Sequence, residues 1–363
     1  MKKPRTPQHA RAALSNPGNR FHAWERDEVD DGWHEGRAFE DEEGADIQRV
    51  LNIDHAKTII TYNTSPDVPF DRSINPYRGC EHGCIYCFAR PSHAYLDLSP
   101  GLDFETRLFY KPDAAALLRK ELDKPSYHCQ AVALGINTDA YQPIERQLNI
   151  TRQLLQALHD YRHPVGLVTK SLLVERDIDI LQAMAQQNLV HVMISLTTLD
   201  RELTKRMEPR ACPPQRRLDI VRRLSEAGIP TGVLIAPVIP VLTDHELEHL
   251  VTQARDAGAQ TVGYVLLRMP HEIKHLFYEW LQQHYPLKAE HIKTRMRDCH
   301  QGSDYQSEFG QRMRGSGAYA QLISQRFSAA VKRNHFPGMV AMETGHFSRP
   351  GERVQMSLFE DVD

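Results

Sequence analysis

Three of the chain's six cysteines, Cys80, Cys84 and Cys87, fall within one short stretch with the spacing C-x3-C-x2-C. Three crowded thiols do not suit a disulfide, which joins a pair and usually forms in an oxidising compartment. A loop that presents three thiolates suits a metal ion or an iron–sulfur cluster. Three ligands also leave one coordination position open, whereas a structural zinc site closes all four. The spacing therefore predicts a chemically active metal centre.

A zinc knuckle is the competing interpretation, with His82 or His93 as the fourth ligand. His82 lies inside the cysteine loop and His93 follows it, so either side chain is within reach in sequence. The spacing alone leaves this alternative open. Iron content and a broad absorbance shoulder in anaerobically purified protein distinguish the two.

The residues around the cysteines read G-C-x-H-G-C-x-Y-C-F-A-R over positions 79–90. This segment resembles the radical S-adenosylmethionine (SAM) superfamily, and within it the spore photoproduct lyase (DNA repair photolyase-like) branch. The resemblance covers roughly residues 66–305. It implies that Cys80, Cys84 and Cys87 hold three irons of a [4Fe–4S] cluster, whose fourth iron binds the amino and carboxylate groups of SAM. It also implies that the backbone of Tyr86 lies by the SAM adenine.

Downstream of the cysteines, apolar strand patterns alternate with helical patterns, which is typical of a parallel sheet with helices outside it. The helical segments include 144–161 and one that opens with a capping box at Thr243–Glu246 and stops at Gly258. We therefore expect an α/β fold, a partial (β/α)6 barrel of the radical SAM type with an N-terminal extension and a C-terminal helical segment. The six expected strands are residues 74–76, 130–136, 165–169, 190–196, 231–237 and 261–267.

In parallel α/β folds the site lies at the carboxyl ends of the strands, so the residues just after each strand are candidates. The segment after the second strand resembles a Thr-Asp-x-Tyr-Gln-Pro-x-Glu segment of photolyase-like relatives. It replaces the Gly-Gly-Glu that binds the methionine amino group in many other radical SAM enzymes. The resemblance thus implies SAM contacts for Asn137, Thr138 and Asp139. A helix N-cap by Thr138 or Asp139 is the alternative.

Lys170 follows the third strand and Ser195 ends the fourth. A lysine at a strand end inside a cleft suits the SAM carboxylate as a point charge. A solvated lysine is the alternative. The resemblance places Ser195 where the ribose-binding residue of the family falls.

Further candidates follow the later strands. Glu208 and Arg210 either reach SAM or pair with each other. The Pro237-x-x-Pro240 segment resembles the loop that frames SAM, although two prolines also simply end a strand. Arg268 either faces the pocket or is an ordinary surface arginine.

Residues 288–333 carry nine Lys/Arg against four Asp/Glu, with aromatic residues interleaved. Basic residues follow phosphates and aromatic residues stack on bases, so this segment favours a nucleic acid partner. The basic loop 312–317 is one place where a phosphate could bind. The alternative is a basic amphipathic helix over 318–333, packed over the barrel mouth. The interleaved aromatic residues are Tyr305, Phe309, Tyr319 and Phe327.

Spore photoproduct lyase uses a distant cysteine as a hydrogen donor. Cys212 and Cys299 are the weak candidates for that role here, because neither lies in a recognised motif. Cys129 precedes an apolar strand and is expected in the core.

Residues 1–24 hold five Lys/Arg and no acidic residue, whereas residues 25–46 hold eleven Asp/Glu. Both stretches lack a clear hydrophobic period, which predicts a polar, disordered extension over 1–55. The radical SAM core is expected over 66–305, and a basic C-terminal segment and tail over 306–363. No signal peptide or apolar run of membrane-spanning length is visible, so we expect a cytoplasmic protein.

The resemblance implies an enzyme, a lyase or a transferase, that reductively cleaves SAM. The resulting 5′-deoxyadenosyl radical would abstract hydrogen, with nucleic acid as the first substrate hypothesis. An electron donor such as flavodoxin or ferredoxin is then required. The alternative is an iron–sulfur protein that binds nucleic acid or acts as a sensor without turnover.

Overall fold

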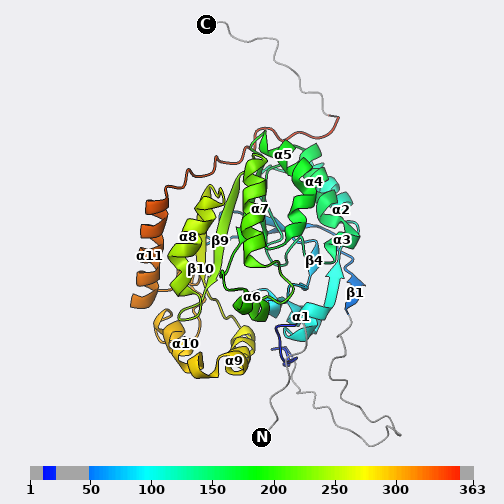
Figure 1. The fold of residues 1–363 in the computed structure, drawn as a ribbon. Helices are drawn as coiled ribbons and strands as arrows, with labels where there is room; N and C mark the ends of the chain where they lie inside the picture. Colours follow the sequence, from blue (N-terminus) through cyan, green and yellow to red (C-terminus); the bar gives the residue numbers. More distant parts are fainter. Residues whose placement is uncertain (1–10, 22–48, 352–363) are drawn as a thin grey trace, which may run out of the picture.

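The computed structural model describes residues 11–21 and 49–351. The first ten residues of the basic start and the acidic run 25–46 lie outside the described residues. The described chain forms one large sheet wrapped by helices and a smaller sheet beside it (Figure 1).

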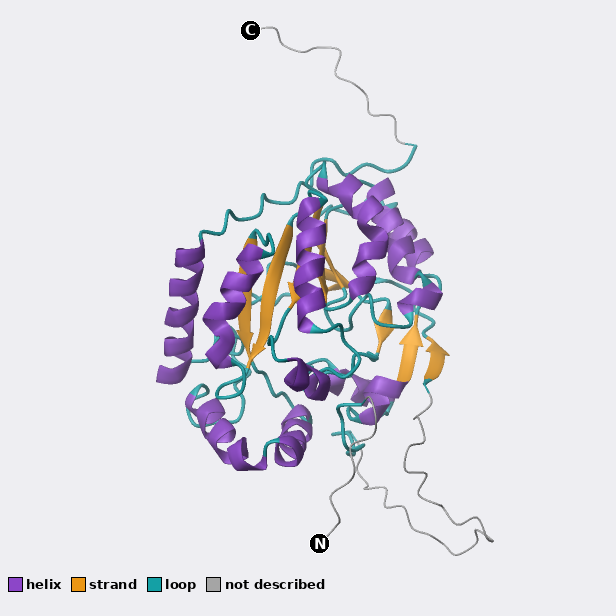
Figure 2. Ribbon diagram, viewed as in Figure 1, coloured by secondary structure: helices purple, strands orange, loops and turns teal. Residues whose placement is uncertain are grey.

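The large sheet has seven strands in the order β10-β9-β8-β7-β6-β3-β2, and every neighbouring pair is parallel except β2 with β3. The arrowheads of its long strands point toward the side of the molecule that carries α6, α9 and α10 (Figures 1 and 2). The strands are β2 (Ile60–Tyr62), β3 (Arg72–Ile74), β6 (Val132–Leu134), β7 (Val165–Thr169), β8 (Val190–Ser195), β9 (Thr231–Val238) and β10 (Thr261–Leu266).

The six parallel strands confirm the predicted α/β partial barrel, and β7 has the predicted bounds. These strands are rich in Val, Ile and Leu because both faces of a parallel sheet are covered. Helices follow the strands and bury their apolar faces on the sheet. The helices between strands are α2 (Ala114–Leu122), α3 (Glu145–Leu148), α4 (Ile150–Asp160), η2 (Leu172–Asp177), α5 (Ile178–Ala185), α6 (Arg201–Met207), α7 (Pro214–Glu226), η3 (Asp244–Glu246) and α8 (Leu247–Asp256).

A separate three-stranded sheet has the order β1-β5-β4, and its strand β4 directly follows β3 of the large sheet in the chain. It was not predicted, because β4 has only two residues and β1 pairs with a strand more than fifty residues away. Its strands are β1 (Val50–Ile53), β4 (Tyr77–Arg78) and β5 (Arg107–Tyr110), and the helices near it are η1 (Arg90–Leu96) and α1 (Leu102–Thr106).

Two helix predictions need correction. The helix expected over 144–161 is broken at Asn149, whose φ of 53° is left-handed; asparagine tolerates that conformation better than most residues. The capping box does not form, because the Thr243 hydroxyl accepts from the Ile239 N–H and the Glu246 carboxylate accepts from the Thr198 hydroxyl. The helix therefore begins with the 3-10 turn η3.

Residues 11–21 differ from the expected disordered extension. Ala12 and Ala13 are buried, and their N–H groups donate to the Glu105 carboxylate of α1. Ser15 donates to Glu279 of α9 (Ile273–His284). The segment therefore forms a strap between the first and the last parts of the barrel, because a buried carboxylate supplies acceptors for its backbone.

The C-terminal region begins with α10 (Pro286–Asp298) and α11 (Ala318–Asn334). Helix α11 packs beside α8 at the edge of the molecule, not over the barrel mouth (Figure 1). Residues 336–351, expected as a tail, run across the amino ends of the strands. There the His191 Nε2 forms a hydrogen bond with the Val340 carbonyl, and the Phe347 ring packs against the ring of His163.

No helix within the described ranges is both long enough and apolar enough to cross a membrane.

Candidate functional site

The cysteine loop follows β4 at the carboxyl end of β3. Cys80 and Cys84 are buried, Cys87 is half-buried, and all three are free thiols. Two glycines let the loop turn, since Gly79 and Gly83 have φ values of 76° and 64°. A Cβ on Gly83 would also lie 2.6 Å from the Glu105 carboxylate, so only glycine fits there.

Arg90 holds the backbone of this loop in place through hydrogen bonds to its carbonyls. Its guanidinium is fully buried and donates to the carbonyls of Gly83 and Cys84, each at 2.8 Å. It also pairs with Glu105 at 2.5 Å, and Glu105 accepts in turn from the strap. The buried ion pair thus connects the backbone of the cysteine loop to α1 and to residues 11–21.

The two histidines of the zinc hypothesis have other contacts. The His82 Nδ1 lies 3.3 Å from the Asp139 carboxylate, and the His93 Nε2 lies 2.9 Å from the Arg107 carbonyl. Within the described ranges, no three His, Cys, Asp or Glu side chains form a group that could hold a single metal ion. A cubane [4Fe–4S] cluster needs a different arrangement. Each thiolate binds a separate iron, so the three sulfurs need not lie within bonding distance of a single metal ion.

The donor set suits an iron–sulfur cluster. Burial raises the pKa of the Cys84 thiol to about 12 and raises that of Cys80 well above its usual range. Buried thiolates therefore need positive charge beside them, which iron supplies. Iron–sulfur clusters are bound by cysteine thiolates, and this loop supplies three cysteines that are not in disulfides.

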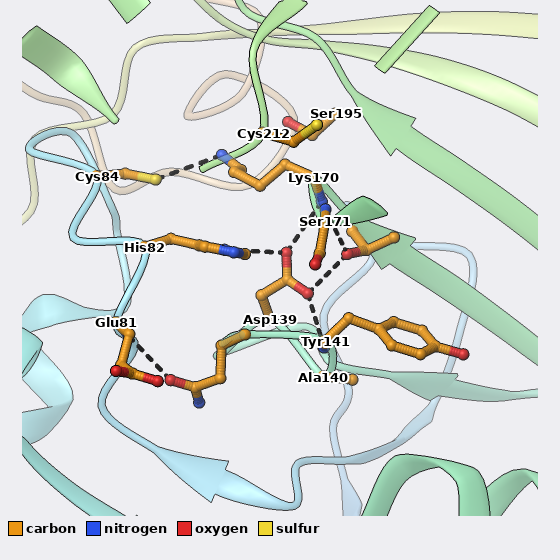
Figure 3. Close-up of polar contacts among 12 residues, drawn as sticks. Glu81, His82, Cys84, Asp139, Ala140, Tyr141, Lys170, Ser171, Ser195 and Cys212 are labelled. Atoms are coloured by element: carbon orange, nitrogen blue, oxygen red, sulfur yellow. Dashed lines mark hydrogen bonds and ion pairs between the residues drawn. The ribbon is translucent and has the colours of Figure 1, made fainter. Parts of the chain in front are cut away.

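Lys170 reaches this loop from the end of β7 (Figure 3). Its Nζ lies 3.5 Å from the Cys84 sulfur and 2.9 Å from the Tyr86 hydroxyl. The Glu208 carboxylate lies 3.5 Å from the same ammonium. Lys170 is therefore not a solvated surface lysine; it places a positive charge against a cysteine of the loop.

Asp139 joins the ends of β6 and β7. Its carboxylate accepts from the Thr169 hydroxyl at 2.7 Å and from the Lys170 N–H at 2.9 Å, and it faces His82 (Figure 3). Burial raises the pKa of this carboxyl, but the contacts with His82, Lys170 and Thr169 outweigh burial and lower it to about 2. Asp139 is therefore an ionised support that orients the two loops around the cysteines.

The other two residues of that segment lie beside it. The Thr138 hydroxyl donates to the Tyr77 carbonyl at 3.0 Å, and the Asn137 N–H donates to the Asn75 side chain at 2.9 Å. Neither Thr138 nor Asp139 caps a helix, since α3 starts after Ile144 with no side-chain cap. The Asn137 side chain is exposed on the rim.

Glu208 lies at the centre of a buried polar network that the sequence did not reveal. It pairs with Arg217 of α7, and both side chains are about 1% exposed. It also accepts from Thr197 at 2.8 Å and from the Tyr86 hydroxyl. Glu208 and Arg210 do not pair with each other, because Arg210 pairs with Glu81. Arg217 looks like one more basic residue of a surface helix, so no sequence signal singles it out.

Ser195 and Cys212 share the Arg217 guanidinium, which donates to the Ser195 carbonyl at 3.1 Å and to the Cys212 carbonyl at 2.7 Å. Figure 3 labels both residues in the same view as Lys170. The Ser195 hydroxyl is 3.4 Å from the Ala236 carbonyl. The Arg217 guanidinium thus connects the backbone of Cys212 to the Glu208 network. Cys299 is buried at the end of α10, where its carbonyl accepts from the Ser316 N–H.

The last two candidates lie near the carboxyl ends of β9 and β10. The Ala236–Pro237 bond is cis at the end of β9. The Arg268 guanidinium lies 5.2 Å from the Phe88 ring, next to Cys87, and its Nε is buried without a hydrogen-bond partner among the described residues. Arg268 therefore faces the cysteine loop.

The sequence matches the radical SAM superfamily over residues 74–254. An uncharacterized protein of Mycobacterium tuberculosis is 38% identical over 273 residues, 75% of this chain and 76% of the relative. An uncharacterized protein of Methanocaldococcus jannaschii is 27% identical over 223 residues, 61% of this chain and 79% of the relative.

Among solved structures, a spore photoproduct lyase variant with bound AdoMet and dinucleoside spore photoproduct is similar in fold. Its TM-score is 0.53 at 15% sequence identity, over 79% of this chain and 80% of that one. At this identity the likeness concerns the fold alone. The family match, the three-cysteine loop and the shared barrel agree, and the chain belongs to the radical SAM superfamily.

Proposed function

We propose that this chain is a radical SAM enzyme whose Cys80, Cys84 and Cys87 hold a [4Fe–4S] cluster with one iron open to SAM. The observation that carries the proposal is the meeting of the cysteine loop with Lys170 at the carboxyl ends of the strands, 3.5 Å from the Cys84 sulfur. When bound, the cluster and SAM together supply an organic radical that removes hydrogen from a substrate. The chain itself supplies orientation and a site shielded from water.

The side chains around the loop suit the parts of SAM. Lys170 offers a point charge to a carboxylate, and the Tyr86 hydroxyl and Glu208 hold its ammonium in place. Ser195 ends β8 and Asn137 follows β6, one on each side of β7, and the resemblance assigns them to the ribose and the amino group. Asp139 keeps the two loops in register through its contacts with His82 and the Lys170 backbone.

We propose a nucleic acid as the substrate class. The support is the dinucleoside photoproduct named for the structurally similar lyase and the basic segment 288–333. Two arginines of that segment already have partners, because Arg312 pairs with Asp67 and Arg314 stacks on Tyr264 at 4.2 Å. Of the interleaved aromatic residues, Phe327 packs on Tyr264, whereas Phe309 is 59% exposed.

Uncoupled SAM cleavage tests the enzymatic proposal. Anaerobically reconstituted protein with dithionite should form 5′-deoxyadenosine from SAM without any substrate. Cys84→Ala should abolish that product, and Cys129→Ala, outside the loop, should not. A cluster-loaded protein that forms none would instead be the iron–sulfur sensor or binding protein.

Filter binding across a salt series tests the substrate proposal. Binding of DNA or RNA should weaken as salt rises, because phosphate contacts release counterions. Binding no tighter than that of a neutral polymer would remove nucleic acid from the proposal and leave the SAM chemistry untouched.

A further inference from the structure

Helix α6 is the layer that separates the cysteine loop from solvent on one side. Leu203 and Met207 of α6 are buried in the same apolar cluster as Cys84, Ile85 and Tyr86. The Ile85 N–H donates to the Met207 carbonyl at 2.9 Å, so the helix end is bonded directly to the loop. Figure 1 shows α6 at the ends of the long strands, above α9 and α10, and the Trp280 indole of α9 donates to the Arg206 carbonyl of α6 at 3.0 Å.

The outer face of α6 is basic. Arg201, Lys205 and Arg206 are exposed. Lys205 pairs with Glu202, the one acidic residue of the helix, at 2.7 Å, and the Arg206 guanidinium lies 5.5 Å from the Tyr285 ring, so the helix keeps an excess of positive charge. We call Arg201, Lys205 and Arg206 the α6 face. The whole chain has a formal charge of −3, so this positive face does not follow from the overall composition.

Two further arginines extend the positive charge toward the loop. Arg49 and Arg210 both pair with one oxygen of Glu81, at 2.9 Å and 3.2 Å. Glu81 lies between two loop residues, Cys80 and His82, and its other oxygen is buried without a hydrogen-bond partner among the described residues. One carboxylate beside two guanidiniums leaves a net positive charge at this edge of the loop.

The other sides of the loop are already in use. Lys170, Ser195 and Asp139 line the barrel side, where the proposed function places SAM and the substrate. The α1 side carries Asp103 and is covered by the strap, which donates to Glu105 and accepts from Leu102. On the remaining side the loop is covered by α6, whose diameter is roughly 10 Å, with α9 packed beside it.

We propose that the α6 face is the docking site for an acidic one-electron carrier protein that reduces the cluster. This inference rests on the proposed function, which requires an electron for each SAM cleavage. A negatively charged carrier would be steered to the α6 face and would stand one helix away from the cysteines. In each encounter the carrier loses one electron and the cluster site gains it, and no bond or proton moves in that step.

The test compares two charge-reversal variants of the full-length, cluster-loaded protein. Arg201→Glu with Lys205→Glu reverses the α6 face, and Lys332→Glu with Arg333→Glu makes the same change in charge at the exposed end of α11. Reduced flavodoxin, an acidic carrier, is mixed with each protein without SAM, and bleaching of the cluster absorbance gives the rate. At low salt the α6 variant should be reduced at least about tenfold more slowly than the parent, because like charges now face each other.

The expected pattern has two further parts. The difference should shrink as salt rises above about 0.15 M, where charges more than about 8 Å apart are screened. Dithionite, a small reductant that needs no protein docking face, should reduce the parent and both variants at equal rates, and iron content should also be equal.

Equal rates with flavodoxin for the α6 variant and the parent would overturn the inference, and so would an equal loss in the α11 variant. Failure of the proposed function is a separate result. If the loaded parent forms no 5′-deoxyadenosine with dithionite, the SAM chemistry is wrong, while the flavodoxin rates still report on docking.

Discussion

Glu105→Gln is the substitution that most sharply tests how the cysteine loop is supported. Glu105 is fully buried, pairs with Arg90 at 2.5 Å and accepts from the Ala13 N–H at 3.0 Å. The amide would leave the buried Arg90 guanidinium without a counter-charge. Its NH2 group would also face a donor on Arg90 or on the strap.

Breaking a buried pair by removing one partner costs about 3–5 kcal/mol. At roughly 2 °C per kcal/mol for a chain of this size, Tm should fall by roughly 6–10 °C. Because Arg90 holds the carbonyls of Gly83 and Cys84, the variant should also lose iron to a chelator faster than the parent. Differential scanning calorimetry and a timed chelator assay measure the two effects.

Arg107→Gln is the matched control. It removes an ion pair, at 3.6 Å and at the end of the same helix, between an exposed Arg107 and a half-buried Asp103, and solvent-accessible pairs contribute about 1 kcal/mol or less. Its Tm and rate of iron loss should stay close to the parent values. A Glu105→Gln variant that behaves like this control would refute the supporting role of the buried pair.

Three further outcomes are expected. Lys170→Met should weaken SAM binding about tenfold, or about 1.4 kcal/mol, in equilibrium dialysis. The control Lys332→Met should leave the affinity for SAM unchanged. Equal SAM affinities of Lys170→Met and the parent would contradict the role of Lys170. Burial lowers the pKa of His163 to about 4, so the unfolded chain takes up the proton first. Stability should therefore fall between pH 6.5 and 4 by up to about 1.4 kcal/mol per pH unit, and His163→Gln should flatten the Tm curve there; parallel curves would refute this. Phe347→Ala should cost about 2 kcal/mol in thermal denaturation, less than the loss for a fully buried ring, without changing iron content; an unchanged Tm would show that residues 336–351 do not stabilise the barrel.

Local patterns were enough to predict the barrel and the cysteine loop. The strand at 165–169 is a short apolar run between helical patterns, three of whose five residues are β-branched, and its observed bounds match the predicted ones. The cysteine spacing is equally local. The break at Asn149 was missed because a helical pattern continues on both sides of it, although asparagine is one of the residues that adopts a positive φ.

Contacts between distant segments could not be read from the sequence. Arg90, Glu105 and Arg217 look like ordinary charged residues, and their burial depends on partners supplied by other elements. The strap is similar, because Ala12 and Ala13 gain buried positions only through the carboxylate of α1. Arg268 could be assigned neither to the pocket nor to the surface until the position of Phe88 was known.

The central claim is that Cys80, Cys84 and Cys87 hold a cluster with an open iron. The most direct measurement is the electron paramagnetic resonance spectrum of anaerobically purified, dithionite-reduced protein, recorded before and after SAM is added. The account predicts a reduced [4Fe–4S] signal that changes on addition of SAM, because SAM binds the iron that no cysteine holds. Protein that contains zinc and no iron, or a cluster signal that SAM leaves unchanged, would contradict it.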